Sequence, residues 1–302
     1  MIDLGTSGMD SALPIEAVFA FQRNRLYDFL KFFYKEKAMF IDVHTHLTHE
    51  RFKADLHEVI ARAEAERLGA IVCNGLEPVS NRQILEMTRT FPIVKAALGI
   101  YPLDAVNHLL AEDFPHRVGK FDVGSEISFI EECAEKGLIS AVGECGLDGH
   151  WLDDSTYKDQ YFVFESLIDI GIRFHLPIIV HSRKMELEAL EVLAHLGAKK
   201  VNMHCYSGKS KWAIAYAESH NWCFSIPANA RRSDSFGKLL RSLPETSILT
   251  ETDAPYLPPF PGARSEPRDV CQTVKYLGEL RGMSFEDAEM LVWRNYEELF
   301  AR

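Results

Sequence analysis

The stretch that decides the fold is "FIDVHTHLTHERF", residues 40–52, in which Asp42, His44 and His46 stand two positions apart behind an apolar start. Side chains alternate between the two faces of a β-strand, so a strand here would place these three side chains on one face. Two neutral imidazoles on one face can hold one divalent cation. The same triplet also fits a plain strand end that turns into a polar loop, and the rest of the chain must decide between the two interpretations.

The composition points to one large globular domain. The chain has 302 residues and is 47% hydrophobic, and α/β barrels of about 250 residues often form a single domain. Its formal net charge of −11 argues against a basic surface over the whole chain but leaves room for a local basic rim. The six cysteines are scattered without a C-x-x-C pair, which is typical of reduced thiols rather than a disulfide framework. The sequence has neither an apolar run of about 20 residues nor a signal-peptide pattern, so we expect a cytoplasmic protein that does not enter a membrane.

Short apolar segments alternate with amphipathic stretches along most of the chain. We expect strands at 40–44, 70–75, 93–99, 140–144, 177–182, 201–205, 222–227 and 247–252. We expect helices at 53–68, 80–90, 125–136, 157–174, 185–196, 209–219, 234–243, 269–281 and 284–300. Eight alternations of strand and helix predict an α/β fold of the (β/α)8 type, a TIM barrel. An open doubly wound sheet is the alternative, but the chain has no glycine-rich phosphate loop to support it.

Residues 1–38 stand apart from this pattern. The segment "EAVFAFQRNRLYDFLKFFYKEK" has the spacing of an amphipathic helix and is rich in phenylalanine. Its charges are mixed rather than mainly basic, which makes a membrane-surface helix the weaker interpretation. We therefore predict a helical, non-catalytic N-terminal extension at 1–38 and a single barrel domain at 39–302.

Polar side chains stand at the ends of five of the expected strands. In a TIM barrel the chemistry collects at the carboxyl ends of the strands. Reading these ends in order gives His44 and His46 (strand one), Glu144 (strand four), His181 (strand five), His204 (strand six) and Asp253 (strand eight). Any one of them alone is explained more simply as an ordinary polar residue with a hydrogen-bond partner. Six at equivalent ends indicate one site, because buried acids and imidazoles need partners.

This set of side chains is suited to two divalent cations. Four imidazoles and two carboxylates fit a pair of metal ions about 3.5–4 Å apart that share a bridging group. We expect Glu144 to bridge, with His44, His46 and Asp253 completing one ion site and His181 and His204 the other. Nitrogen ligands favour Zn or Mn, while Mg remains open with water filling vacant positions. Such a centre activates water for hydrolysis of a phosphoester or an acyl bond, with Asp253 as our choice of general base. Asp42, deeper on the same strand face, is a candidate partner for a ligand.

Several segments resemble the signature motifs of a known family. "DVHTH", "GECGLD", "VHSR", "HCYSG" and "ETDAPYL", with "RSEP" at 264–267, are similar to those of the TatD-type metal-dependent hydrolases in the amidohydrolase-like superfamily. The resemblance runs from about Phe40 to the C-terminus with the same order and spacing. It implies a TIM barrel, a divalent-metal centre, deoxyribonuclease activity and the six ligands named above.

The sequence departs from the family motifs in two places. The family usually has G-x-H-P after the third strand, whereas this chain has "GIYP", with Tyr101 in place of the histidine. We expect Tyr101 to contact the substrate, since an aromatic ring there can stack on a base or sugar. After "GLD" many members have a tyrosine, and this chain continues Gly149-His150-Trp151.

Positive charges near the expected site bear on the substrate. Basic residues follow the strands on the presumed catalytic side: Arg183, Lys184, Lys209, Lys211, Arg231, Arg232, Arg264 and Arg268. We predict that Arg183 and Arg264 bind substrate, because a guanidinium suits a phosphate group. The favoured substrate is DNA or another phosphoester, with no obligate protein partner. An amide or ester hydrolase using the same site is the alternative, and a metal-binding protein without catalysis is a third hypothesis, which the intact ligand set and Asp253 argue against.

Overall fold

The structure is a computed structural model that describes residues 39–115 and 119–301. The helical extension predicted for residues 1–38 lies outside these described residues. Within them, the chain alternates between strand and helix from residue 40 to residue 300.

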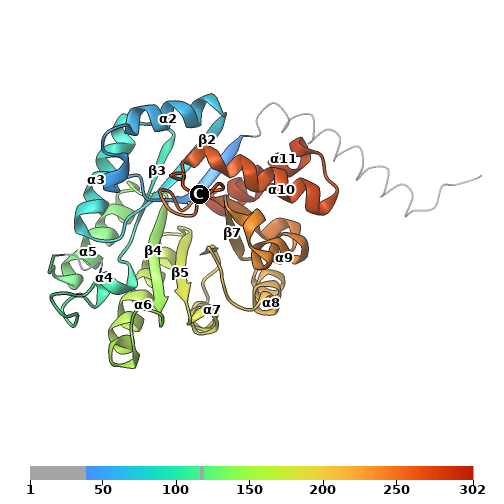
Figure 1. Cartoon of the computed structure of the whole chain (residues 1–302). Coiled ribbons are helices and arrows are strands. Elements are labelled where there is room, and N and C mark those ends of the chain that lie inside the picture. Colours follow the sequence, from blue (N-terminus) through green and yellow to red (C-terminus); the bar gives the residue numbers. More distant parts are fainter. Residues whose placement is uncertain (1–38, 116–118, 302) are drawn as a thin grey trace, which may run out of the picture. The chain divides into compact units, whose positions relative to one another are not determined.

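Eight parallel strands form one sheet in which each strand pairs with the next along the chain (Figure 1). The strands are β1 (Phe40–Thr45), β2 (Leu68–Asn74), β3 (Val94–Leu98), β4 (Ala141–Asp148), β5 (Ile178–Arg183), β6 (Val201–His204), β7 (Cys223–Pro227) and β8 (Ile248–Glu251). The chain after β8 returns to β1 through a parallel bridge between Thr45 and Ala254. The backbone N–H of Asp253 donates to the carbonyl of His44 at 2.9 Å, beside this bridge. The sheet therefore closes as a TIM barrel, and the open doubly wound alternative is wrong.

Helices cover the outside of the barrel, so each strand is shielded from solvent on its outer face (Figure 1). They are α2 (Leu56–Ala65), α3 (Pro78–Thr90), α4 (Pro102–Ala105), α5 (Val123–Glu135), α6 (Tyr157–Arg173), α7 (Glu186–His195), α8 (Ser210–His220), α9 (Asp234–Ser242), α10 (Val270–Arg281) and α11 (Phe285–Phe300). Short 3-10 helices are η1 (Glu50–Phe52), η2 (Asp154–Thr156), η3 (Ala230–Arg232), η4 (Glu245–Ser247) and η5 (Pro267–Asp269). Local signals set their ends: Ser284 caps the start of α11 by accepting from the N–H of Asp287, and left-handed Gly282 ends α10.

The predicted strands are confirmed, with one extension that matters for function. β4 runs to Asp148, four residues past the predicted end, and all eight of its residues are buried. Gly146 lies in this extension at φ 151°, where a Cβ atom would stand 1.9 Å from the carbonyl oxygen of His181. Glycine there allows β4 and β5 to stay paired to their ends, because it leaves space for the neighbouring backbone. The short helix α4 and the 3-10 helices are elements that the sequence did not predict.

Within the described ranges, no helix combines the length and the apolar character that crossing a bilayer requires.

Candidate metal centre

The first and last strands of the barrel meet at a buried carboxylate. Asp42 is fully buried and accepts hydrogen bonds from the backbone N–H of His44 at 3.2 Å and of Thr252 at 3.0 Å. Its other oxygen accepts from the Thr252 hydroxyl. Asp42 thus fixes the backbone of β1 against the chain after β8, rather than holding a ligand side chain as the sequence suggested.

His44 and His46 project from β1 toward the mouth of the barrel, where Asp253 meets them from the other side of this seam. Asp253 follows β8 in the left-handed region, at φ 54°, a conformation that aspartate adopts more readily than most residues. A turn fixes this conformation, since the N–H of Tyr256 donates to the carbonyl of Asp253 at 2.8 Å. The carboxylate oxygen Oδ1 of Asp253 then lies 3.3 Å from Nε2 of His46 and 3.7 Å from Nε2 of His44.

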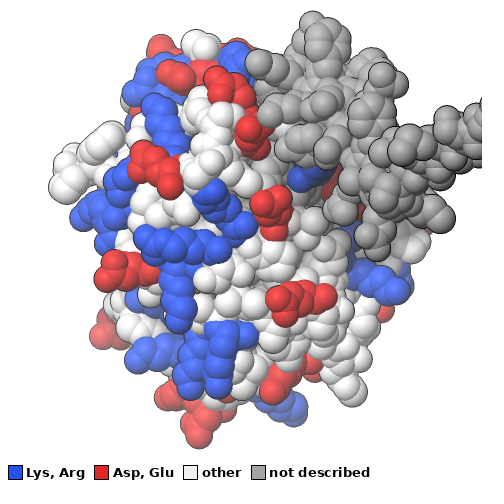
Figure 2. Space-filling model, turned by 90° about the vertical axis from the view of Figure 1, so that its right-hand side faces the viewer, with Lys and Arg blue, Asp and Glu red and all other residues white. Residues whose placement is uncertain are grey.

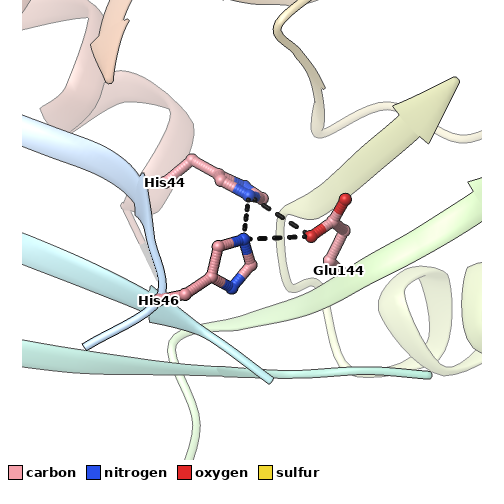
Figure 3. A group of neighbouring side chains, drawn as sticks. All are labelled: His44, His46 and Glu144. Atoms are coloured by element: carbon pink, nitrogen blue, oxygen red, sulfur yellow. Dashed lines mark hydrogen bonds and ion pairs between the residues drawn. The ribbon is translucent and has the colours of Figure 1, made fainter. Parts of the chain in front are cut away.

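One oxygen of Glu144 completes this first group. The two Nε2 atoms of His44 and His46 are 3.2 Å apart, and Oε2 of Glu144 lies 3.3 and 3.5 Å from them. Figure 3 shows these three side chains pointing toward one another from two strands. Four ligands held tetrahedrally at about 2.1 Å from a zinc ion would be about 3.4 Å apart, so the spacing fits such an ion.

The other oxygen of Glu144 faces the remaining two imidazoles. Oε1 lies 3.0 Å from Nδ1 of His181 and 3.9 Å from Nε2 of His204. The rings of His44 and His204 stack with centroids 3.5 Å apart, so the two groups adjoin each other. The structure therefore brings all six predicted ligands into one cluster, with Glu144 between its two halves.

Buried carboxylates orient two of these imidazoles from behind. Oδ2 of Asp148 lies 3.1 Å from Nε2 of His181, and Oε2 of Glu251 lies 3.0 Å from Nδ1 of His204. A carboxylate behind an imidazole fixes which ring nitrogen carries the proton and raises the basicity of the other. Neither partner was among the residues predicted from the sequence. Period-two spacing could have found them, because Asp148 stands four residues after Glu144 and Glu251 two residues before Asp253.

Burial and mutual attraction set the charges in the cluster. Burial lowers the pKa of His44 to about 4, helped by the positive charge of His204, so the ring is neutral and offers a lone pair. Burial also opposes the charged form of His204, but Glu251 outweighs it and raises this pKa to about 10. The pKa of Glu144 is well below its usual value, because the surrounding imidazoles overcome the effect of burial. The cluster thus concentrates ionised carboxylate beside nitrogen donors, and a divalent cation would compete with protons for these atoms.

A cavity of about 810 Å³ opens above the cluster and is lined by five of the predicted ligands, all but His44, together with Arg183 and Tyr101. The Tyr101 ring packs edge-on against His181 with centroids 4.8 Å apart. Burial raises the pKa of Tyr101, so the phenol stays neutral. Trp151 and Tyr256 also line the cavity and are 39% and 48% exposed, which leaves ring surface available to a ligand.

Other predicted or considered residues lie elsewhere. Both terminal nitrogens of Arg264 bind the carboxylate of Asp55, at 2.8 and 2.6 Å, and within the described residues Arg264 does not line the cavity. Its predicted substrate contact gains no support from this geometry, which gives Arg264 a structural role between two loops. Tyr206, two residues after His204, is fully buried and offers no stacking surface.

Comparison with known proteins places the chain in a family. A family model described as TatD related DNase matches residues 41–301. The chain is 31% identical over 268 residues to the uncharacterized metal-dependent hydrolase YabD of Bacillus subtilis, covering 87% of this chain and 99% of YabD. It is 30% identical over 266 residues to human deoxyribonuclease TATDN3, covering 87% of this chain and 94% of the relative. The crystal structure of the TatD homologue YjjV from Escherichia coli has the same fold, with a TM-score of 0.75 at 23% identity over 88% of this chain and 99% of YjjV. The family match, the closed barrel and the His/Glu cluster agree, and the chain belongs to the TatD-related DNase family as a metal-dependent hydrolase.

Proposed function

We propose that this protein hydrolyses phosphodiester bonds of DNA with two divalent metal ions held by the six clustered side chains. The observation that carries the proposal is the position of Glu144, whose two oxygens face two separate groups of nitrogen donors. His44, His46 and Asp253 would hold one ion together with Glu144, and His181 and His204 would hold the other. The mixed nitrogen and oxygen donors suit Zn or Mn, and Mg fits if water completes its shell.

The ions and the side chains divide the work of hydrolysis. When bound, the ions act as Lewis acids that lower the pKa of water and neutralise charge developing on the phosphoryl group. Asp253 lines the cavity, and its histidine neighbours hold its pKa low against the effect of burial. It is therefore ionised at neutral pH and accepts the proton of the attacking water as general base. Asp148 and Glu251 keep the ligand rings in place.

The cavity wall supports a nucleic-acid substrate. Arg183 lines the cavity and, among the described residues, makes no ion pair with a carboxylate, so its guanidinium is available to a phosphate. The Cζ atom of Arg183 lies 6.0 Å from the centroid of the Trp151 ring. The Trp151 ring offers a surface on which a base can stack. Tyr101 extends this aromatic wall next to His181. A named deoxyribonuclease among the relatives agrees with this reading of the cavity.

A comparison of substrates tests the proposal. Metal-loaded protein is incubated with labelled single-stranded and duplex DNA, with bis(p-nitrophenyl) phosphate and with a panel of acyl amides and esters. We expect DNA and the small diester to be cut, and Asp253→Asn to abolish both activities while the exposed control Asp169→Asn leaves them unchanged. Hydrolysis of the amides or esters with no phosphodiester cleavage would overturn the assignment in favour of a deacylase.

Metal content tests the bridging role of Glu144 separately from catalysis. We expect two divalent ions per chain in the unaltered protein by elemental analysis after gel filtration. Glu144→Gln weakens both groups at once, because each loses a charged oxygen, and should hold fewer than one ion. An unchanged content of two ions in Glu144→Gln would exclude a bridging carboxylate.

Two predictions concern the chain outside this cluster. We expect a protein lacking residues 1–38 to keep its activity on the small diester, since we assign this segment no catalytic role. We also expect the protein in the cytoplasm, which fractionation of cells with an antibody to this chain can check.

A further inference from the structure

A groove of about 490 Å³ lies on the surface between the starts of α8 and α9. We call it the lysine groove, and it is lined by Gly208, Lys209, Ser210, Lys211, Asp234, Ser235 and Lys238. It contains none of the six clustered side chains, and no step of the proposed chemistry uses it.

The lysine groove and the catalytic cavity are lined in part by consecutive residues of one loop. Ser207 lines the cavity, and the next residue along the chain, Gly208, lines the groove. Both belong to the loop that follows β6, which carries His204 at its end. The two linings are therefore separated by a single peptide bond at Ser207, which is close enough for one chain-like ligand to contact both.

The lining of the groove carries three positive charges and one negative charge. Lys209, Lys211 and Lys238 are exposed, and across residues 39–115 and 119–301 none of them forms an ion pair with a carboxylate. Asp234 is the one acidic residue in its lining. The nearby Arg231 differs from these lysines, because its guanidinium forms an ion pair with Glu279 at 2.7 Å.

The basic character stands out on a protein with a net charge of −11. Figure 2 shows Lys and Arg side chains gathered in a band on the face that carries α8 and α9 in Figure 1, with acidic side chains more scattered around it. Local positive potential of this kind attracts polyanions even when the whole protein is acidic. Serine hydroxyls in the same lining can donate to phosphate oxygens, as they do in nucleic-acid complexes.

We propose that the lysine groove binds backbone phosphates of a nucleic-acid strand whose scissile bond lies in the catalytic cavity. This rests on the proposed phosphodiesterase function and deepens it, because it makes a polynucleotide, rather than a mononucleotide or small diester, the preferred substrate. The three ammonium groups act as point charges that follow the backbone without reading its sequence.

The test compares two triple variants of the metal-loaded full chain. One carries Lys209→Ala, Lys211→Ala and Lys238→Ala, and the control carries Lys53→Ala, Lys158→Ala and Lys199→Ala, three exposed lysines outside both the groove and the cavity. Each is assayed on a labelled single-stranded 20-mer and on bis(p-nitrophenyl) phosphate at several salt concentrations.

We expect the KM of the groove variant for the 20-mer to be higher on the order of tenfold. The slope of log KM against log salt should fall by about 2, because each of the three lost phosphate contacts contributes about 0.7. Its kinetic constants on the small diester, and both constants of the control variant, should stay unchanged. If the two variants cut the 20-mer with equal KM values, the proposed phosphate binding by the groove is wrong, while the proposed function still stands. If the unaltered protein cuts neither substrate, the proposed function fails. In that case fluorescence anisotropy measures the affinity of each variant for the labelled 20-mer. Equal affinities of the two variants would refute phosphate binding by the groove.

Discussion

The carboxylate behind His204 allows a sharp test of how the cluster holds a metal ion. Glu251 is fully buried at the end of β8, where its Oε2 lies 3.0 Å from Nδ1 of His204 and also accepts from the Ser225 hydroxyl. In Glu251→Gln the amide oxygen can still accept from the imidazole, so the ring keeps its orientation. The negative charge that raises the basicity of the opposite ring nitrogen is lost.

The expected loss of metal affinity in Glu251→Gln follows from this geometry. Partners that orient a ligating imidazole typically contribute 10–100-fold to metal affinity, or about 1.4–2.7 kcal/mol. We expect a value in the upper half of this range, because Glu251 is shielded from water and its charge is poorly screened.

A competition titration with a chromophoric chelator measures the effect on zinc affinity directly. The matched control is Glu289→Gln, which removes another buried carboxylate outside the cluster. Glu289 lies on helix α11, and its carboxylate is 2.6 Å from the guanidinium of Arg67. The control should bind zinc like the unaltered protein. If Glu251→Gln binds zinc within twofold of the control, the charge of Glu251 does not tune His204, and our account of this contact is wrong.

Three further predictions concern other contacts. Asp148→Asn should weaken zinc binding on the His181 side by a similar 10–100-fold in the same titration, since it removes the charge behind that ring. Arg183→Ala should raise KM for DNA and flatten its salt dependence by about 0.7 in slope while leaving metal content unchanged, which kinetics at several salt concentrations will show. Arg264→Ala should lower the midpoint of thermal unfolding without changing KM for bis(p-nitrophenyl) phosphate, because its ion pair with Asp55 is structural. Arg264 holds the pKa of Asp55 at about 2, below its usual 3.8, so the pair stabilises the fold above pH 3.8 and loses this contribution as the pH falls toward 2. Urea unfolding across this window should show a weaker pH dependence in Arg264→Ala.

Much of the fold could be read from the sequence because its signals are local. β5 begins with an apolar run that leads to His181, and the amphipathic stretches between strands have helical spacing. The strand order then follows from the rule that a parallel barrel pairs consecutive strands, which also brings all strand ends to one mouth. The convergence of His44 and Asp253 could thus be anticipated, although they stand at opposite ends of the barrel sequence.

The missed parts either lie outside the side chains read at the strand ends or depend on contacts between segments that are far apart in the sequence. The predicted strand ended at Glu144, so Asp148, four residues further along β4, was not identified as the partner of His181. In the folded chain Gly146 allows close approach of β5. For Arg264, its place after the last strand suggested a phosphate contact, which stays a prediction, whereas the ion pair with the distant Asp55 could not be read from the sequence.

The seam between β1 and the chain after β8 has a consequence for the timing of activity during synthesis. Thr45 and Ala254, the residues that bridge it, are 209 positions apart in the chain. A ribosome must therefore make nearly the whole polypeptide before His44 and His46 can meet Asp253. An unfinished or truncated product would lack the complete set of donors, so a cell would be protected from a half-made nuclease.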